Sequence, residues 1–591
     1  MNIDQLKFRF KIYHLGLLLI VLGIYFRFSG LNWDAGQHLH PDERFLTMVA
    51  NDMTLPKSWG EYFDPSVSTF NPANINFPFF VYGVFPVTLN KTIAILLNNN
   101  NYHDLTIQGR FLSALFDSLN IFILFFFVKN IKKWSKTLNI DGLEWWSAAI
   151  YAALVLPIQL SHFFAVDTFV NTFILGSLFF ALPNNLNIDK KNTLRILLSA
   201  VFFGLALASK ISAVYSAPLI IVFLLWVKIC TIWQKKIQYV FVVKQFLRGL
   251  FFVLFPFFLT TYITLRMTNP YYFENPSFFN PAISKLFIGN INQLKGFNDP
   301  LTMFPPGIQW KSKIPILFPL QNIAFFGLGI PISTLVLIGT TIVVLRAGRN
   351  RDLFTGAILF WSLAFFIYQG LQFTHSMRYF LAIYPWLAVF AGTALSIMFY
   401  KLNKSSDKPS LMIQKPLITL IIISILTWPM AFTAIYRQPH SRVEASNWIY
   451  QNILPGSKLL SEHWDDGLPL SSDFGYPGIY QGEQLEVFVP DSQLKMSKIA
   501  TQLESADYYI ISSNRAWQSI SDDANNFPLM SEFYNKLFAD QIPNYKLVKA
   551  FASFPKLCLP FTNYCYEIND QWAEEAFTVY DHPQVFVFKN L

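Results

Sequence analysis

Charged residues are scarce in this chain of 591 residues. Asp, Glu, Lys and Arg make up only 14% of it, whereas 53% is hydrophobic and 17% aromatic. In soluble domains about a quarter of all residues are charged, so this composition excludes an ordinary soluble protein. It predicts a polytopic α-helical membrane protein.

Cysteine is also rare, with three residues in the chain. Cys230 lies near the end of a hydrophobic stretch, and Cys558 and Cys565 lie close together in the C-terminal region. Either these two form a disulfide in an oxidising compartment or they are free, buried thiols. Both interpretations stay open, because proximity in sequence does not fix the geometry of a bond.

The N-terminal segment lacks a small-residue cleavage site. Basic residues precede its first hydrophobic stretch, as in a secretory signal. That stretch, of roughly 19 residues, is long for a signal core. We therefore expect an uncleaved membrane anchor.

Hydrophobic stretches near the length of about 20 residues that crosses a bilayer recur as far as Tyr436 and then stop. We predict about eleven crossings. They lie at residues 12–30, 107–129, 143–160, 165–182, 194–209, 211–229, 247–265, 318–346, 352–369, 377–400 and 416–436. The chain is then divided into a membrane domain, residues 1–436, and a soluble domain, residues 437–591, long enough for its own core.

Positive charge is concentrated in alternate loops. The basic segments are KFRFK at the start, KNIKKWSK after Val128, DKKNTLR at Asp189, WQKK at Trp233, RAGRNR at Arg346 and KLNKSSDK at Lys401. Because cytoplasmic loops are enriched in Lys and Arg, we predict a multi-pass protein of a bacterial cell membrane. Its N-terminus is cytoplasmic and its soluble domain extracytoplasmic. The net charge of +9 follows from these segments and needs no nucleic-acid partner.

One hydrophobic stretch, residues 76–97, does not fit as a crossing. It contains Pro78, Pro86, Asn90 and Lys91. Counting it as a span would place KNIKKWSK outside the cell, against the charge rule. We expect an interfacial or re-entrant segment, within a first outer loop of residues 31–106.

The sequence HPDERF in that loop places Asp42 and Glu43 directly after a proline. Residues Asp42, Phe45, Leu46, Val49 and Met53 have helical spacing. The acids either stabilise the start of a short helix or take part in catalysis. Asp34 and Asp52 are expected to be solvated surface residues.

More polar residues are predicted at the same membrane face. His162 and Asp167 lie where the fourth crossing begins, and a carboxylate at that boundary is costly unless it faces water or a partner. Arg110, Lys210 and Arg378 lie on the same side by topology. Each cation could instead contact lipid phosphate, but five such groups at one face favour a site.

Five ordered segments resemble the GT-C glycosyltransferases, in particular the protein O-mannosyltransferase and aminoarabinose-transferase-like group, known as glycosyltransferase family 39. They are HPDERF, GRFLSALFDSLNIFILFFFVKNI, PIQLSHFFAVDTFVNTF, GLALASKISAVYSAPL and RYFLAIYPWLAVFAG. The resemblance covers roughly residues 10–400. No single segment is decisive, and their order, spacing and sidedness together carry it.

This resemblance implies inverting transfer of a sugar from a polyprenyl-phosphate donor at the extracytoplasmic face. The acceptor is the hydroxyl of a protein, a lipid or a glycan, and membrane lipids surround the protein. By the family's pattern Asp42 is the general base, and Asp167 matches the second acidic position, which either orients the sugar or joins a metal site. Arg110, Lys210 and Arg378 are candidates for holding the phosphate. Glu43, His40 and His162 are supporting candidates.

A divalent metal is a further alternative for these residues. The candidate ligands are His38, His40, Asp42, Glu43, His162 and Asp167. Their types suit Zn²⁺ or Mn²⁺, but their spacing matches no closed structural site. We expect that no cofactor is required and that the histidines bind sugar hydroxyls.

Three other features leave alternatives open. Asp117, inside the second crossing, either lines a cavity below Arg110 or pairs locally. The aromatic residues of the outer loop 266–315 either stack on sugars or form an interfacial belt, which is commoner. In SEHWDDGLP, the acids Glu462, Asp465 and Asp466 with His463 either recognise the acceptor or form a solvated turn.

The C-terminal tail alternates helical and strand periodicity, which predicts a small α/β or α+β domain over the outer mouth. Its end, FTVYDHPQVFVF, resembles the closing motif of multi-spanning proteins named for a YYY signature, although no YYY run is present. The competing function class is a transporter or a non-catalytic lipid-carrier scaffold. The absence of repeated halves disfavours a transporter, whereas an inactive homologue of the same fold stays open.

Overall fold

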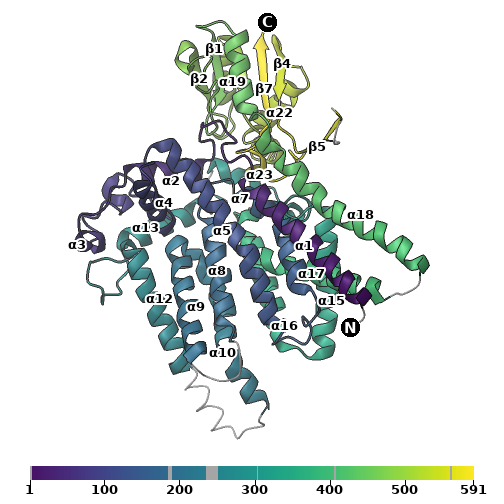
Figure 1. Ribbon diagram of the computed structural model, residues 1–591. Helices are drawn as coiled ribbons and strands as arrows, with labels where there is room; N and C mark the ends of the chain where they lie inside the picture. The colour runs from purple at the N-terminus through teal and green to yellow at the C-terminus, as the bar shows by residue number, and fades with distance from the viewer. Residues whose placement is uncertain are drawn as a thin grey trace.

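The fold is given by a computed structural model (Figure 1). It describes residues 3–183, 190–234, 250–301, 304–404, 408–558, 562 and 564–591. Parts of several predicted features lie outside the described residues, among them Asp189, Lys235–Lys236, positions 247–249 at the start of the seventh crossing, positions 302–303 of the outer loop 266–315, and positions 405–407. The side chain of Cys230 lies outside them as well.

Long apolar helices form a bundle below a smaller mixed domain (Figure 1). Within the part of the chain that the structure describes, seven helices are long and apolar enough to cross a membrane. They belong to α5 (Tyr102–Ile131), α9 (Lys190–Ser209), α12 (Phe255–Thr268), α15 (Ile330–Asn350), α16 (Leu353–Gly370), α17 (Tyr384–Lys404) and α18 (Lys408–Thr433). Shorter apolar helical stretches lie at His14–Phe28 within α1 (Ile3–Phe28), Phe85–Leu96 (α4), Asp167–Ala181 (α8), Ile211–Trp226, which continues into α10 (Ala217–Gln234), and Leu317–Gly327, which begins with α14 (Leu317–Asn322). The chain is a multi-pass helical membrane protein.

Two predicted crossings are interrupted. Residues 143–160 form α6 (Leu143–Ala152) and the short α7 (Val155–Leu160), separated by extended backbone at Leu154. Arg27 donates to the carbonyls of Tyr151 and Ala152 at the end of α6. Hydropathy registers only a continuous apolar run, so it misses a break that a side chain from another helix stabilises.

The crossing predicted at 318–346 is interrupted as well. A π-helical turn, η6 (Ile323–Gly327), precedes Gly329, whose φ of +80° favours glycine. A Cβ at this position would lie 2.6 Å from the Trp428 ring. The backbone therefore turns here, and α15 begins only at Ile330.

Arg27 also forms an ion pair with Asp117. Its Nε donates to Asp117 Oδ2 at 2.6 Å, and neither side chain has exposed surface. The Tyr151 hydroxyl donates to the other carboxylate oxygen. Of the two alternatives for Asp117, local pairing is confirmed.

The first outer loop folds into short helices against the bundle: α2 (Pro41–Asp52), α3 (Trp59–Phe63), η1 (Pro72–Ile75) and α4. Helix α4 has 12 residues, too few to cross a bilayer, and packs on α2 and α5. Lys91 donates to the Asn51 carbonyl at 3.2 Å, and Asn90 to the Leu105 carbonyl at 2.9 Å. The polar residues of α4 therefore bind neighbouring backbone and avoid lipid.

The second large outer loop contains η4 (Pro270–Tyr272), α13 (Lys285–Phe297) and η5 (Pro305–Trp310). Arg266, at the end of α12, is buried and donates to carbonyls of this loop, among them those of Asn275 and Asn280. Tyr271, Tyr272 and Phe273 are buried as well. For these three rings the interfacial-belt prediction is wrong, because they pack against protein.

The C-terminal domain is mixed α/β, in agreement with the sequence pattern. A five-stranded sheet has the order β2-β1-β3-β7-β4, with β1, β2 and β3 parallel and β7 antiparallel to β3 and β4. The strands are β1 (Lys458–Glu462), β2 (Gln481–Leu485), β3 (Tyr508–Ile511), β4 (Tyr545–Phe551) and β7 (Val585–Asn590). The helices are α19 (Ser441–Asn452), α20 (Gln493–Glu504), α21 (Trp517–Asp522), α22 (Pro528–Phe538) and α23 (Glu575–Thr578).

A separate hairpin contains the two C-terminal cysteines. Strands β5 (Lys556–Cys558) and β6 (Cys565–Glu567) pair so that the two cysteines lie opposite each other. They form a disulfide. The structure thus decides between the bonded and free alternatives.

After this hairpin the chain returns to the bundle through residues 570–583, which we call the docking segment. The Phe577 ring lies 5.2 Å from that of Phe432 and 5.7 Å from that of Phe326. Asp581 accepts hydrogen bonds from Tyr436 and Gln159. The motif YDHP therefore joins the C-terminal domain to the membrane helices.

His582 ties the docking segment together between Asp570 and Asp581. Burial would lower the pKa of His582, but the two carboxylates raise it to about 10. The unfolded chain loses this proton near pH 6.5. The stabilisation is therefore complete below about pH 6.5 and is lost as pH rises towards about 10.

We expect the melting temperature of the detergent-solubilised protein to fall between pH 7 and pH 10 more steeply than that of a His582→Gln variant. The variant should melt lower than wild type at pH 6. Parallel melting curves for the two proteins across this pH range would contradict the role given to His582.

Candidate active site

Helix α2 presents the two acids of the HPDERF motif. Pro41 occupies the first turn, where its fixed φ suits helix initiation. His40 caps the helix, because its Nδ1 accepts from the Glu43 amide at 3.3 Å. Asp42 and Glu43 are thus not needed as caps, and both form ion pairs with distant cations.

Asp42 pairs with Arg378, which lies in the 3-10 turn η7 (Met377–Ile383) that precedes α17. Arg378 Nη1 donates to Asp42 Oδ2 at 2.6 Å. The two side chains are 25% and 24% exposed, so this pair is open to solvent. A ligand can reach it without unfolding.

A second pair of the same kind lies beside the first. Lys210, between α9 and η2 (Ile211–Ser216), donates to Asp167 Oδ1 at 2.9 Å. The Tyr379 ring lies 5.1 Å from Lys210 Nζ and 5.2 Å from Arg378 Cζ. Four of the predicted residues therefore meet in one place, which we call the four-charge cluster: Asp42, Asp167, Lys210 and Arg378.

The cluster changes the proton affinity of Asp42. Burial alone would raise the pKa of this carboxyl, but the Arg378 guanidinium, with a smaller contribution from His40, lowers it to about 2. Asp42 is therefore ionised at neutral pH, as a general base must be. It is also a weak base for as long as Arg378 is bound to it.

Arg110 and Glu43 are not part of the open cluster. Arg110 donates to both oxygens of Glu43, at 2.9 and 2.6 Å, and to both of Asp34, at 3.1 and 2.7 Å. All three side chains are buried, and Glu43 also accepts from the Phe164 amide. The prediction that Asp34 is solvated is wrong. An Arg110 contact to a donor phosphate would require this buried triad to open.

The two predicted histidines are buried as well. His40 stacks on Phe163, with ring centroids 4.3 Å apart, and lies 4.5 Å from the Tyr580 ring of the docking segment. His162 stacks on Tyr436 at 3.6 Å. Both His162 ring nitrogens contact backbone carbonyls, of Ile158 and Ser29, so the expectation that this ring binds sugar hydroxyls is wrong. For His40 the expectation stays a prediction.

The metal alternative gains no support from this geometry. Within the described residues, no three His, Cys, Asp or Glu side chains lie close enough together to hold a metal ion. The suggested ligands His40, Asp42 and Asp167 face three different partners: the Glu43 amide, Arg378 and Lys210. Whether the protein needs a metal stays a prediction.

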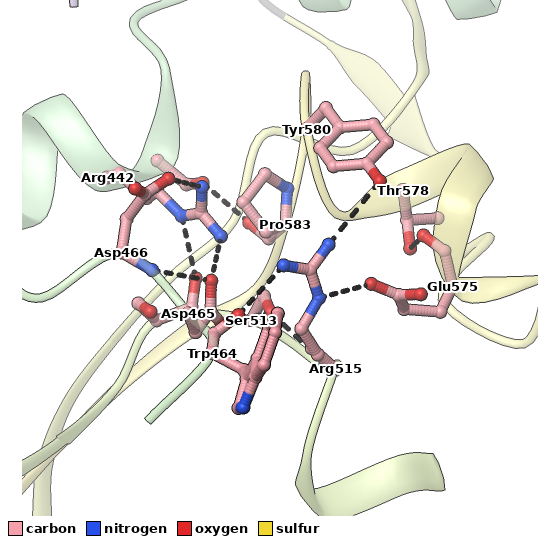
Figure 2. Close-up of polar contacts among 12 residues, drawn as sticks. Arg442, Trp464, Asp465, Asp466, Ser513, Arg515, Glu575, Thr578, Tyr580 and Pro583 are labelled. Atoms are coloured by element: carbon pink, nitrogen blue, oxygen red, sulfur yellow. Dashed lines mark hydrogen bonds and ion pairs between the residues drawn. The ribbon is translucent and has the colours of Figure 1, made fainter. Parts of the chain in front are cut away.

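Two of the acids of SEHWDDGLP, Asp465 and Asp466, bind arginines (Figure 2). Arg442 donates to Asp465 at 2.7 Å and to Asp466 at 2.8 Å. Asp466 also accepts from Arg44 of α2 at 3.0 Å, and Glu462 is buried. The solvated-turn interpretation is wrong for these three acids. One of their contacts links the C-terminal domain directly to the helix that carries Asp42.

Arg515 takes part in a second connection between the C-terminal domain and the residues around α2, which the sequence did not reveal (Figure 2). It donates to Glu575 at 2.7 Å, to the Trp464 carbonyl at 2.9 Å and to the Tyr580 hydroxyl at 3.4 Å. Tyr580 in turn lies against His40. No local pattern predicts such a network, because its members are far apart in the chain.

Glu574 of the docking segment holds the backbone next to Arg378. Its carboxylate accepts from the Ser376 hydroxyl at 2.7 Å and from the Met377 amide at 3.0 Å. The Glu574 amide donates to Asn322 at 2.7 Å. Burial raises the pKa of Glu574 to about 7, against the effect of these hydrogen bonds. Glu574 is thus a positioning residue for the four-charge cluster.

Replacing Glu574 with alanine should therefore lower the kcat of a reaction at the four-charge cluster by about 10²-fold, because small displacements of a catalytic group have effects of that size. Glu574→Gln, which keeps one acceptor oxygen, should recover part of the loss. The exposed Glu532, in α22, provides the matched control Glu532→Ala. If the Glu574 variants changed only the melting temperature and not kcat, the positioning role would be excluded.

The sequence matches no family model and no curated protein. The fold nevertheless is similar to that of solved GT-C glycosyltransferases, in agreement with the GT-C resemblance seen in the sequence. The crystal structure of the Archaeoglobus fulgidus oligosaccharyltransferase tethered with an acceptor peptide has a TM-score of 0.50, with 12% identity over 94% of this chain and 74% of that one. ArnT from Cupriavidus metallidurans in the apo state has a TM-score of 0.44, with 11% identity over 85% of this chain and 94% of that one.

Proposed function

We propose that the protein transfers a sugar from a polyprenyl-phosphate donor to an acceptor hydroxyl, with inversion at the anomeric carbon. The observation that carries this proposal is the four-charge cluster. It combines a solvent-accessible carboxylate with two cations, drawn from separate segments of a GT-C fold. General-base catalysis and stabilisation of a leaving phosphate need these groups.

In the proposed reaction Asp42 accepts the proton of the acceptor hydroxyl as that oxygen bonds to the anomeric carbon. The bond from the anomeric carbon to the phosphate oxygen breaks, and its electrons stay on the lipid phosphate. Arg378 and Lys210 stabilise the charge that develops there. Asp167 holds Lys210 and orients the sugar, whereas Arg110, Glu43, His40 and His162 maintain the shape of the site.

The Asp42–Arg378 pair also supports a defined order of events. A donor phosphate competes with Asp42 for the Arg378 guanidinium, since both are anions that bind arginine bidentately. Partial loss of Arg378 raises the pKa of Asp42 from about 2 and makes it a stronger base. Donor binding therefore activates Asp42 before the acceptor reacts.

The proposed topology places this site outside the cell. The N-terminus of α1 lies at the end of that helix that points away from the C-terminal sheet (Figure 1). Eleven crossings, with a cytoplasmic N-terminus in a bacterial cell membrane, agree with the basic loops. Residues 1–436 then form the membrane domain, and residues 437–591 the extracytoplasmic domain.

The proposed acceptor is a hydroxyl of a protein, a lipid or a glycan. Purified protein would be incubated with radiolabelled polyprenyl-phosphate sugars and each acceptor class, with and without a metal chelator. We expect a labelled product with at least one donor, and the chelator arm decides the metal requirement. Zero transfer across a broad donor panel would favour the non-catalytic scaffold and overturn the proposal.

A further inference from the structure

A cavity of about 320 Å³ lies between the first outer loop and the loop that follows α12. Aromatic rings and amides line it, including Phe77, Tyr82, Tyr272, Phe287, Asn269 and Asn290. The Tyr272 and Phe287 rings pack against each other, with centroids 4.1 Å apart. Its volume is at the small end of the range for ligand sites.

Asn269 is the most informative residue of this cavity. Its side chain is buried, and neither its amide nitrogen nor its amide oxygen has a hydrogen-bond partner. The hydroxyl of Tyr272, also buried, lies next to the Asn269 amide, and the two groups form no hydrogen bond of good geometry. Buried polar groups are normally satisfied, and leaving them unpaired costs free energy. Asn269 and Tyr272 both line the cavity, and a polar ligand there would supply the partners that this amide and hydroxyl lack.

The charge of the lining defines the class of ligand. Lys285 is the cation that lines the cavity, and it pairs with Glu274 at 3.4 Å. Arg266, nearby, is occupied by backbone carbonyls. Glu274 and Lys285 are the charged residues of the lining, so it has no net positive charge to attract a phosphate or carboxylate. It offers ring faces together with an amide donor and an amide acceptor, which suit a neutral ring bearing several hydroxyls.

Tyr82 connects this cavity to the four-charge cluster. It lines the cavity, and its hydroxyl lies within electrostatic range of Asp42, Arg378 and Asp167. A ligand here would therefore be a neighbour of the reacting groups. We propose that the cavity binds a saccharide ring next to the one that is transferred, on either the lipid-linked donor or the acceptor glycan. This subsite rests on the proposed glycosyl transfer.

The test uses the full-length protein in detergent with free mono- and disaccharides as probes, followed by saturation-transfer NMR. We expect binding by wild type and at least a tenfold loss of affinity in Asn269→Leu and in Tyr272→Phe. Asn269→Leu should not lower the melting temperature, because it removes an unpaired buried amide. The control is Asn452→Leu, at an exposed asparagine of the C-terminal domain.

Transfer assays then identify the source of the ring. If Asn269→Leu impairs transfer from a polyprenyl-linked disaccharide but not from a monosaccharide, the ring belongs to the donor. A loss confined to glycan acceptors assigns it to the acceptor. Asp42→Asn should keep saccharide binding while it loses transfer, so the two proposals fail separately. Equal affinity in wild type and both cavity variants, or no binding of any probe, would overturn the subsite.

Discussion

Asp42→Asn should lower sugar transfer by about 10²–10⁴-fold, the contribution of a positioned general base. The substitution keeps the shape of the side chain but removes its ability to take the acceptor proton. It also ends the ion pair with Arg378, which then meets the donor phosphate without a competing carboxylate. The KM for donor should therefore stay the same or fall while kcat is lost.

Steady-state kinetics with radiolabelled donor would measure both constants. Asp52→Asn is the matched control, since Asp52 lies at the other end of α2 and is exposed, as the sequence predicted. Its kcat should equal that of wild type. A higher KM with an unchanged kcat in Asp42→Asn would assign Asp42 to substrate binding and exclude it as the base.

Arg110→Ala should have the largest effect on stability, about 3–5 kcal/mol. The reason is that Asp34 and Glu43 would be left as two buried, unpaired carboxylates within the same triad. The triad also holds α2 against α5 and the turn at residues 31–39. Its loss should therefore displace Asp42 and lower transfer indirectly.

Thermal unfolding in detergent would measure this effect. Arg44→Ala is the control, because the Arg44 side chain is 39% exposed and Asp466 keeps its second partner, Arg442, so a loss of about 0–1 kcal/mol is expected. Combining Arg110→Met with Asp34→Asn and Glu43→Gln should recover part of the stability. If Arg110→Ala melted like wild type but lost affinity for the donor, the original prediction that Arg110 binds the donor phosphate would be supported instead.

The site shows where sequence reasoning succeeds and where it stops. Asp42, Asp167, Lys210 and Arg378 were predicted at one membrane face from topology and ordered motifs, and they form one cluster. The same reasoning placed Arg110, His40 and His162 with them, because topology predicts at which membrane face a residue lies but not how deeply its side chain is buried in the protein. Burial separates the two sets, and only packing determines burial.

The amino-acid sequence by itself determined the membrane class, the mixed α/β C-terminal domain and the segments that carry the charged residues. These depend on composition and on local periodicity, which any stretch of chain carries independently. Only the tertiary structure decided that crossings 143–160 and 318–346 are broken, that Asp34 is buried, and that Glu574 and Tyr580 reach the site. Those outcomes depend on contacts between residues far apart in the chain, and local sequence does not encode such contacts one segment at a time.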